Sequence, residues 1–292
     1  MYDRILVPVD GSAPAKRAVG YGTLLAEAYG AELELLHVLA RGGGEGAGDD
    51  GGTDSDAERG AAVLGSAREV VGDRVPVETR LLDGVPHRVV SDHVAGSEVD
   101  LVVMGRRGRA GLGEGLLGSV TERVLVGTDV PVLVVPEGDP ETVPDGLSTV
   151  LLPTDGSENA EAATGHAVDL VRRFGAAIHV ATVVDAESAG GLFGAEDVTD
   201  DLVERLEAGG EEAVARMVEA VRAVDPDLDP ATAVVHGTPH EGIRDYVLDH
   251  GVDLVAMGSR GRSDIERQLF GSVTKRVLRV VDVPVLVVRD AE

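Results

Sequence analysis

The sequence predicts an α/β protein built from two similar domains, each containing a parallel sheet. Short apolar runs of strand length alternate with longer stretches whose apolar residues recur at helical spacing. Strands that alternate with helices favour a parallel sheet with right-handed crossovers. The same succession of segments then occurs a second time, and a chain of 292 residues is long enough for two domains of ordinary size.

Five apolar runs mark the expected strands of the first half, at residues 4–9, 32–39, 75–82, 101–104 and 130–135. Helices are expected between them, at residues 13–29, about 57–71, 86–95 and about 119–127. Ser12 suits the N-cap of the first helix, and Gly30 suits its end. Residues 41–56 are rich in glycine and aspartate and have no periodicity, so we expect a surface insert without regular structure there.

The second half repeats the landmarks of the first in the same order. LLPTDGS at residues 151–157 corresponds to ILVPVDGS at residues 5–12, and VPVLVV occurs at both 130–135 and 283–288. Between the two halves, the stretch PEGDPETVPDG carries three prolines and four acidic residues, which indicates a linker. We therefore predict domains at residues 1–136 and 148–292, joined by an acidic, proline-rich linker at 137–147.

One glycine motif follows an apolar run in each half of the chain. It consists of Gly, two residues, Gly, nine residues and Gly-Ser. The first copy has Gly105, Gly108, Gly118 and Ser119, and the second has Gly258, Gly261, Gly271 and Ser272. Glycine lets the backbone approach a ligand closely, and the N–H groups at a helix start favour anions. We therefore predict a phosphate-binding loop in each domain.

Three familiar nucleotide-binding motifs are excluded. Residues 113–119 have the spacing of a P-loop but lack its lysine. Residues 113–118 spell G-x-G-x-x-G, but they lie too far beyond the strand for a dinucleotide site and have no counterpart in the second half. The set of protein-kinase motifs is absent as well.

The glycine motif, together with Pro-x-Asp-Gly-Ser after the first strand, resembles the universal stress protein family. The resemblance covers both halves, so the chain looks like a tandem, UspA-like member. It implies two Rossmann-like domains of the adenine nucleotide alpha hydrolase type. Each would have a five-stranded parallel sheet of order 3-2-1-4-5 with helices on both faces. Members with an intact glycine motif generally bind ATP, and domains of this family pair through the fifth strand.

The resemblance implies an ATP site in each domain, with Mg²⁺ on the phosphates. Asp10 and Asp155 would contact the ribose hydroxyls. The adenine would lie against Pro8 and Val38 in the first domain and against Pro153 and Val183 in the second. The phosphates would be surrounded by Gly105, Arg106, Gly108, Arg109, Gly118, Ser119 and Val120 in the first domain, and by Gly258, Ser259, Gly261, Arg262, Gly271, Ser272 and Val273 in the second. Arg107 and Arg260 add positive charge.

Several of these residues also have purely structural interpretations. Glycines after a strand can simply form a turn, and Asp10 or Asp155 can merely cap the first helix of its domain. The arginines can form a solvated face that offsets nearby acids, and Ser119 and Ser272 suit helix N-caps. The second loop also contains Asp264 and Glu266, which would either repel phosphate or hold a divalent ion.

Composition limits the partners and the compartment expected for the protein. The net charge is −26, from 52 acidic and 26 basic residues, so we expect repulsion from nucleic acid and anionic membranes. An acid excess with only two lysines indicates that the protein is adapted to molar salt in the cytoplasm. The alternative is an ordinary acidic protein that binds a basic partner. There are no cysteines, and the apolar runs are too short to span a membrane. The first strand begins so early that a signal peptide has no room, so we expect a cytoplasmic protein.

The sequence favours an ATP-binding sensor or regulator of the stress response whose two domains form a pseudo-dimer within one chain, with further homodimerisation left open. The first alternative is a slow ATPase or an enzyme that transfers phosphate or adenylate. The second is an interaction scaffold that binds no nucleotide. We identify no catalytic residues, no metal-binding residues and no redox cofactor. His240-Glu241 begins like a zinc-protease motif, but position 244 is arginine, and His87 and His240 are interpreted as partly buried structural residues.

Overall fold

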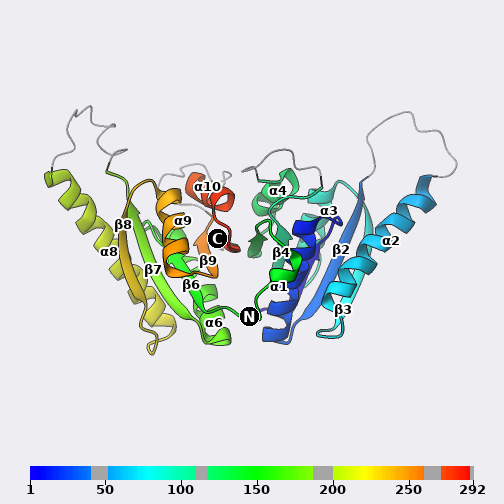
Figure 1. The fold of residues 1–292 in the computed structure, drawn as a ribbon, viewed down its shortest axis with the longest axis horizontal. Helices are drawn as coiled ribbons and strands as arrows, with labels where there is room; N and C mark the ends of the chain where they lie inside the picture. The colour runs from blue at the N-terminus through cyan, green and yellow to red at the C-terminus, as the bar shows by residue number, and fades with distance from the viewer. Residues whose placement is uncertain (41–51, 110–116, 187–199, 260–270, 290–292) are drawn as a thin grey trace. The chain divides into compact units, whose positions relative to one another are not determined.

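The computed structural model describes residues 1–40, 52–109, 117–186, 200–259 and 271–289 (Figure 1). The chain divides into two compact units, Met1–Asp145 and Gly146–Glu292. Each unit contains a parallel sheet with helices on both faces, which confirms the predicted fold class.

The sheet of the first unit has the strand order β3-β2-β1-β4-β5. Its strands are β1 (Arg4–Pro8), β2 (Glu32–Ala40), β3 (Val77–Gly84), β4 (Leu101–Gly105) and β5 (Val132–Val135). Helices α1 (Ala13–Tyr29) and α2 (Gly52–Val71) pack together on one face, and α3 (Pro86–Ala95) and α4 (Ser119–Gly127) pack together on the other. The order reverses between β1 and β4, which places a crevice at their carboxyl ends.

The second unit repeats this arrangement with the order β8-β7-β6-β9-β10. Its strands are β6 (Thr149–Pro153), β7 (Ala177–Val184), β8 (Ala231–His236), β9 (Leu254–Gly258) and β10 (Val285–Val288). Its helices are α5 (Glu158–Glu161), α6 (Thr164–Phe174), α8 (Asp200–Val224), α9 (Pro239–His250) and α10 (Ser272–Val280). The counterpart of α1 is therefore divided into two helices, α5 and α6.

The ends of α1 form as the sequence predicts. The Ser12 hydroxyl accepts a hydrogen bond from the Ala15 N–H, and Gly30 ends the helix with a left-handed φ of 68°. The start of α2 differs from the prediction, because the helix begins at Gly52 and so includes the last five residues of the predicted insert. Acidic residues are favourable in the first turns of a helix, so a segment rich in aspartate can extend α2 toward its N-terminus. The rest of the insert, residues 41–51, lies outside the described residues.

The segment after β5, predicted as a linker, packs against α1 of the first unit. Nη1 of the buried Arg17 donates hydrogen bonds to the carbonyl oxygens of Pro136 and Glu137, each at 3.0 Å. A short 3₁₀ helix, η1 (Pro140–Thr142), follows and contacts α1. Val143 then lies so close to Gly20 that a Cβ at position 20 would be 2.7 Å from its side chain. The segment therefore belongs to the packed structure of the first unit.

Arg17→Ala is expected to lower the free energy of unfolding by about 1–3 kcal/mol, because two carbonyl groups lose their buried donor. Urea unfolding followed by circular dichroism measures this change. Arg205→Ala is the control, because the side chain of Arg205 is exposed and pairs only with the exposed Asp201 in the described part of the chain. It should stay within about 0.5 kcal/mol of the parent. Equal stability of the two variants would contradict the anchoring role of Arg17.

Candidate functional site

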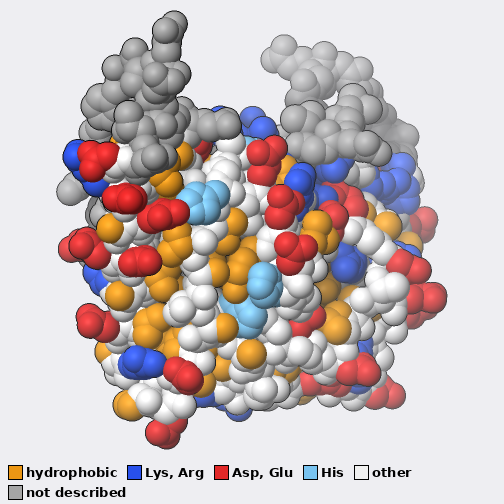
Figure 2. Space-filling model, turned by 60° about the vertical axis from the view of Figure 1, so that its left-hand side comes forward, with side chains coloured by type: hydrophobic (Ala, Val, Ile, Leu, Met, Phe, Trp, Pro, Cys, Tyr) orange, Lys and Arg blue, Asp and Glu red, His pale blue; other side chains and the backbone are white. Residues whose placement is uncertain are grey.

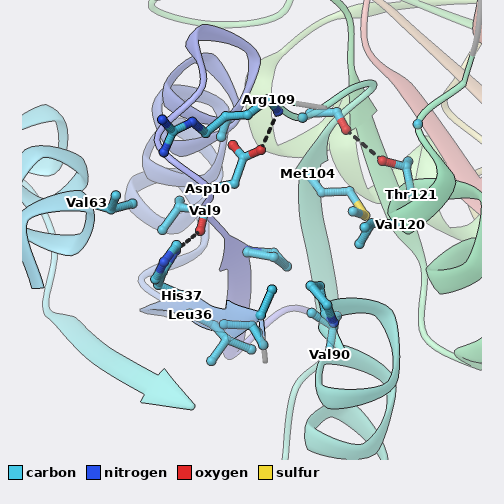
Figure 3. Close-up of a pocket in the computed structure, with 18 of the residues that line it drawn as sticks. Val9, Asp10, Leu36, His37, Val63, Val90, Met104, Arg109, Val120 and Thr121 are labelled. Carbon is cyan, nitrogen blue, oxygen red and sulfur yellow. Dashed lines mark hydrogen bonds between the residues drawn. The ribbon is translucent and has the colours of Figure 1, made fainter. Parts of the chain in front are cut away.

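A cavity of about 700 Å³ opens at the carboxyl ends of β1, β2 and β4 in the first unit (Figure 3). It lies at the switch point of the strand order, where sheets of this type bind ligands. With one exception, Arg106, the residues predicted for the first nucleotide site line this cavity. They are Pro8, Asp10, Val38, Gly105, Gly108, Arg109, Gly118, Ser119 and Val120.

The cavity has a polar end and an apolar end. Figure 3 shows Asp10 and Arg109 at one end, and Leu36 and Val90 at the other. Val38 and Met104 add apolar surface to the lining. A molecule that carries both a flat apolar group and a charged group matches this division.

Part of the cavity wall was missed by the sequence analysis. Helix α2 contributes Asp56, Arg59, Gly60 and Val63, whose spacing places them on one helical face. That spacing is visible in the sequence, but nothing in the sequence shows that this face borders the crevice. His37 at the end of β2 also lines the cavity, and its Nδ1–H donates to the Val9 carbonyl at 2.7 Å.

Asp10 connects the end of β1 to the glycine loop. Its Oδ1 accepts the Ser12 N–H at 3.0 Å, and its Oδ2 accepts the Arg109 N–H at 2.7 Å. Each carboxylate oxygen can accept a second hydrogen bond, so Asp10 can still serve a ligand. In the second unit, Oδ1 of the exposed Asp155 accepts from both the N–H and the hydroxyl of Ser157. The alternative that these aspartates cap the helices is wrong, because Ser12 and Ser157 are the N-caps and each aspartate instead accepts the N–H of the capping serine.

Contacts within the protein already disfavour a side chain at the glycines of the first motif. A Cβ at Gly105 would lie 2.9 Å from the backbone of Pro14, and one at Gly108 would lie 2.4 Å from Oδ2 of Asp10. At Gly118 the nearest atoms, at 3.1–3.2 Å, belong to the backbone of Arg106 and Arg107. Packing already favours glycine at these three positions, so a ligand has to be argued from the rest of the site.

The glycine loop closes in the same way in both units. The Gly118 N–H donates to the Arg106 carbonyl at 2.9 Å, and the Thr121 hydroxyl donates to the Gly105 carbonyl at 3.0 Å. In the second unit, Gly271 and Thr274 make the corresponding bonds to Ser259 and Gly258 at 2.8 and 3.0 Å. These equivalent closures fix the start of α4 and of α10 next to the end of the preceding strand.

The start of α4 faces the cavity without a side-chain cap. Gly118 occupies the N-cap position, and Ser119 is the first helical residue. The same holds for Gly271 and Ser272 at α10. The prediction that the two serines cap these helices is therefore wrong. The loop closure puts the preceding glycine, Gly118 or Gly271, at the N-cap position instead. Ser119, Val120 and Thr121 all line the cavity, so the first turn of α4 presents N–H groups to an anion.

The arginines of the first loop do not all face the cavity. Arg106 is buried, and its guanidinium forms an ion pair with Glu137, with Nε 2.7 Å from Oε2. Nε of Arg107 lies 2.6 Å from Oε1 of the same carboxylate, but this side chain also lines the cavity. Arg109 is exposed at the rim. Burial raises the pKa of Glu137, but hydrogen bonds from Arg106 and the residue's own backbone, and the charges of Arg106 and Arg107, outweigh it and lower the pKa overall.

The second unit places most of its predicted residues at the corresponding positions. Pro153 is the last residue of β6, and Val183 lies near the end of β7. The second loop is flanked by Gly258, Ser259, Gly271, Ser272 and Val273. Gly258 is even more tightly packed than Gly105, because a Cβ there would be 2.1 Å from the Asn159 carbonyl oxygen. Val183 contacts α9, with its side chain 2.7 Å from the position of a Cβ on Gly242. Gly261 and Arg262 lie outside the described residues, as do Arg260, Asp264 and Glu266.

The two histidines singled out from the sequence lie outside the residues that line the cavity. His87 and His240 are half-buried, as predicted. Burial lowers the pKa of His87, and the nearby charges of Arg123 and Arg88 lower it further.

Among the described residues, no three His, Asp or Glu side chains are grouped to hold a metal ion. No described helix is long and apolar enough to cross a membrane.

Gly105→Ala is expected to lower the free energy of unfolding by about 1–3 kcal/mol, because the added methyl group meets the backbone of Pro14. Gly65→Ala is the matched control, since Gly65 lies in α2 with nothing within 4 Å of its Cβ position. This control should gain up to about 1 kcal/mol from the higher helix propensity of alanine. Urea unfolding of both variants tests the contrast, and a fully stable Gly105→Ala protein would show that packing does not demand this glycine.

Comparison with known proteins places the fold and the loops in one family. The model of the universal stress protein family matches residues 1–136 and again residues 146–289. A universal stress protein of Mycolicibacterium smegmatis is 32% identical over 300 aligned positions, which cover 98% of this chain and 96% of the relative. Another, from Methanocaldococcus jannaschii, is 32% identical over 140 positions, 48% of this chain and 81% of its own length.

A solved structure shows the same two-domain fold. The crystal structure of a universal stress protein from Archaeoglobus fulgidus superposes with a TM-score of 0.73 and 24% identity, covering 99% of this chain and 98% of that one. The family model matches almost the whole chain in two copies, and the Mycolicibacterium relative extends over nearly its full length. The chain therefore belongs to the universal stress protein family, as a tandem member that carries two family domains.

Proposed function

We propose that this protein is an ATP-binding regulator of the stress response, and that the cavity of the first unit holds the nucleotide. The observation that carries the proposal is the meeting of three features at one switch point. These are the uncapped first turn of α4, the carboxylate of Asp10 and an apolar cavity end next to Val38. In a nucleotide, the phosphate would meet the first turn of α4, the ribose would meet Asp10, and the adenine would meet the apolar end.

The dimensions and chemistry of the cavity support this assignment. Its volume of about 700 Å³ falls within the range of pockets for small ligands, about 300–1,000 Å³. The adenine would lie against Pro8, Val38 and Met104, and Asp10 would accept hydrogen bonds from the ribose hydroxyls. The phosphates would bind the N–H groups of Ser119 and Val120 and the side chains of Arg107 and Arg109. Mg²⁺ would be held mainly by the phosphates and by water.

A binding function is favoured over catalysis. Both oxygens of Asp10 already accept backbone N–H groups, which suits a carboxylate that orients a sugar rather than one that moves a proton. His37 is oriented by its bond to the Val9 carbonyl, and among the described lining residues no nucleophile is hydrogen-bonded to a base. A slow ATPase remains the alternative activity, and a scaffold that binds no nucleotide remains the second.

Asp10→Ala is expected to weaken ATP binding at least about tenfold, because two hydrogen bonds to the ribose are lost. Calorimetric titration with ATP and Mg²⁺ in high KCl measures the affinity and the number of sites per chain. Asp155→Ala applies the same change to the second unit, so the pair separates the two sites. Asp73→Ala, an exposed carboxylate away from the cavity, should bind as the parent does.

Three outcomes of this titration decide between the candidate functions. Saturable binding that Asp10→Ala weakens supports the proposal. Phosphate release above a protein-free control, lost in Asp10→Ala, would favour the ATPase. A parent protein that ignores ATP and releases no nucleotide on denaturation would contradict the proposal and favour the scaffold.

We also propose that the protein works in a cytoplasm of high salt. Acidic side chains are spread over the face shown in Figure 2, with fewer basic ones between them. At a net charge of −26, repulsion among these groups opposes the compact state unless salt screens it. Raising the ionic strength from about 0.1 M to about 1 M shortens the Debye length from about 10 Å to about 3 Å.

The midpoint of urea unfolding is therefore expected to rise steadily between about 0.1 M and about 1 M KCl. Chloride is the suitable anion, because sulfate stabilises most proteins through its exclusion from the protein surface rather than through charge screening. A matched series with sucrose at equal osmolarity controls for solute exclusion. A midpoint that does not move with KCl would contradict the proposed adaptation to salt.

A further inference from the structure

One buried threonine ties the start of α4 to the end of β4. The Thr121 hydroxyl donates to the Gly105 carbonyl oxygen at 3.0 Å, and only 2% of Thr121 is exposed (Figure 3). The two residues lie 16 positions apart, at the two ends of the glycine loop. The second bond of this closure joins backbone atoms, from the Gly118 N–H to the Arg106 carbonyl. Thr121 therefore supplies the part of the closure that a substitution can remove.

This bond differs from the one that a helical threonine commonly makes, which runs to the carbonyl four residues earlier. Thr23 in α1 makes the common bond, with its hydroxyl 2.8 Å from the Val19 carbonyl oxygen. Thr121 is the third residue of α4 and bonds to a strand outside its helix instead. Thr274 repeats this bond in the second unit, to the Gly258 carbonyl at 3.0 Å. The bond therefore serves the junction between helix and strand rather than the helix itself.

The point on β4 to which Thr121 bonds is itself held in place. The Arg106 N–H donates to the Val135 carbonyl of β5 at 2.7 Å, which fixes the chain directly after Gly105 to the neighbouring strand. Gly105 also lies close to the start of α1, where a Cβ would be 2.9 Å from the backbone of Pro14. Through Thr121, the first turn of α4 takes its position from these fixed parts of the sheet.

The chemistry of the hydroxyl separates positioning from ligand binding. A hydroxyl has one proton to donate, and Thr121 donates it to Gly105. An ionised phosphate oxygen only accepts, so the Thr121 side chain has no donor left for it. The backbone N–H groups of Ser119 and Val120 have no partner within the helix, and both residues line the cavity. Hydrogen bonds weaken steeply when their angle is poor, so the orientation of this turn determines how well it holds a phosphate.

We propose that Thr121 is a positioning residue for the phosphates of the nucleotide, which keeps the N–H groups of the first turn of α4 facing the cavity by holding that turn to Gly105. This inference rests on the proposed nucleotide site and adds to it the side chain on which the preference for phosphorylated ligands over the bare nucleoside depends. Asp10 and the apolar end of the cavity take no part in this bond, so adenosine should bind almost independently of Thr121. Thr274 has the same role in the second unit.

The test removes the hydroxyl and keeps the shape of the side chain. Thr121→Val is expected to weaken binding of ATP by the first site about five- to tenfold, while binding of adenosine stays within about twofold. Thr121→Ser restores a hydroxyl at the same position and should bind ATP within about twofold of the parent. Calorimetric titrations are made in the Asp155→Ala background, which weakens the second site.

Thr23→Val is the matched control for the loss of a buried threonine hydroxyl. Thr23 is fully buried in α1, outside the described residues that line the cavity. Whatever its effect on the midpoint of urea unfolding, Thr23→Val should keep the parent's ratio of ATP to adenosine affinity, whereas Thr121→Val should lower it. Thr274→Val in the Asp10→Ala background repeats the test in the second unit and decides the question if Thr121→Val does not fold.

Each outcome bears on one proposal. A lower ratio of ATP to adenosine affinity in Thr121→Val, reversed in Thr121→Ser, supports the positioning role. Unchanged ATP affinity in Thr121→Val would overturn that role, and so would an equal loss for ATP and adenosine, because the effect would then be structural. A Thr121→Ser protein as weak for ATP as Thr121→Val would also overturn it, since the hydroxyl would not be the group that matters. A parent protein that binds neither molecule would overturn the nucleotide site itself.

Discussion

The close approach of β4 to the start of α1 is the constraint on which the rest of the first site depends. A Cβ at position 105 would lie 2.9 Å from the backbone of Pro14, so a side chain there would push the strand and the helix apart. This contact brings the glycine loop to Asp10, whose carboxylate accepts the Arg109 N–H. The Gly118 N–H and the Thr121 hydroxyl then donate hydrogen bonds to the backbone at the end of β4, and these bonds hold the start of α4 beside the cavity.

The duplicated chain shows which parts of this arrangement can vary. Loop closure by Gly271 and Thr274 and the tight packing of Gly258 recur in the second unit, so the backbone of the site is kept. The side chains around it change, since Arg106 becomes Ser259 and the half-buried Asp10 becomes the exposed Asp155. The described parts of the two units thus share this loop closure but differ in the charges around it.

The sequence predicts the fold well because its signals are local. Strand-length apolar runs and the caps Ser12 and Gly30 locate most elements, and the repeated motifs reveal the duplication. Features that depend on contacts across the fold were not accessible in this way. The face of α2 with Arg59 and Val63 borders the cavity only because of how the helix packs, and the pairing of Arg106 with Glu137 joins residues 31 positions apart. The serines were misplaced as caps because the loop closure, invisible in the sequence, determines where α4 begins.

The position of Glu137 also shows that the family repeat and the first folded unit end at different residues. The family match to the first copy ends at residue 136, one residue before the carboxylate that balances the buried Arg106. The repeat as a unit of sequence and the first unit as a unit of folding therefore have different ends. A first domain expressed alone needs the chain at least through Val143 to keep its charges and its packing complete.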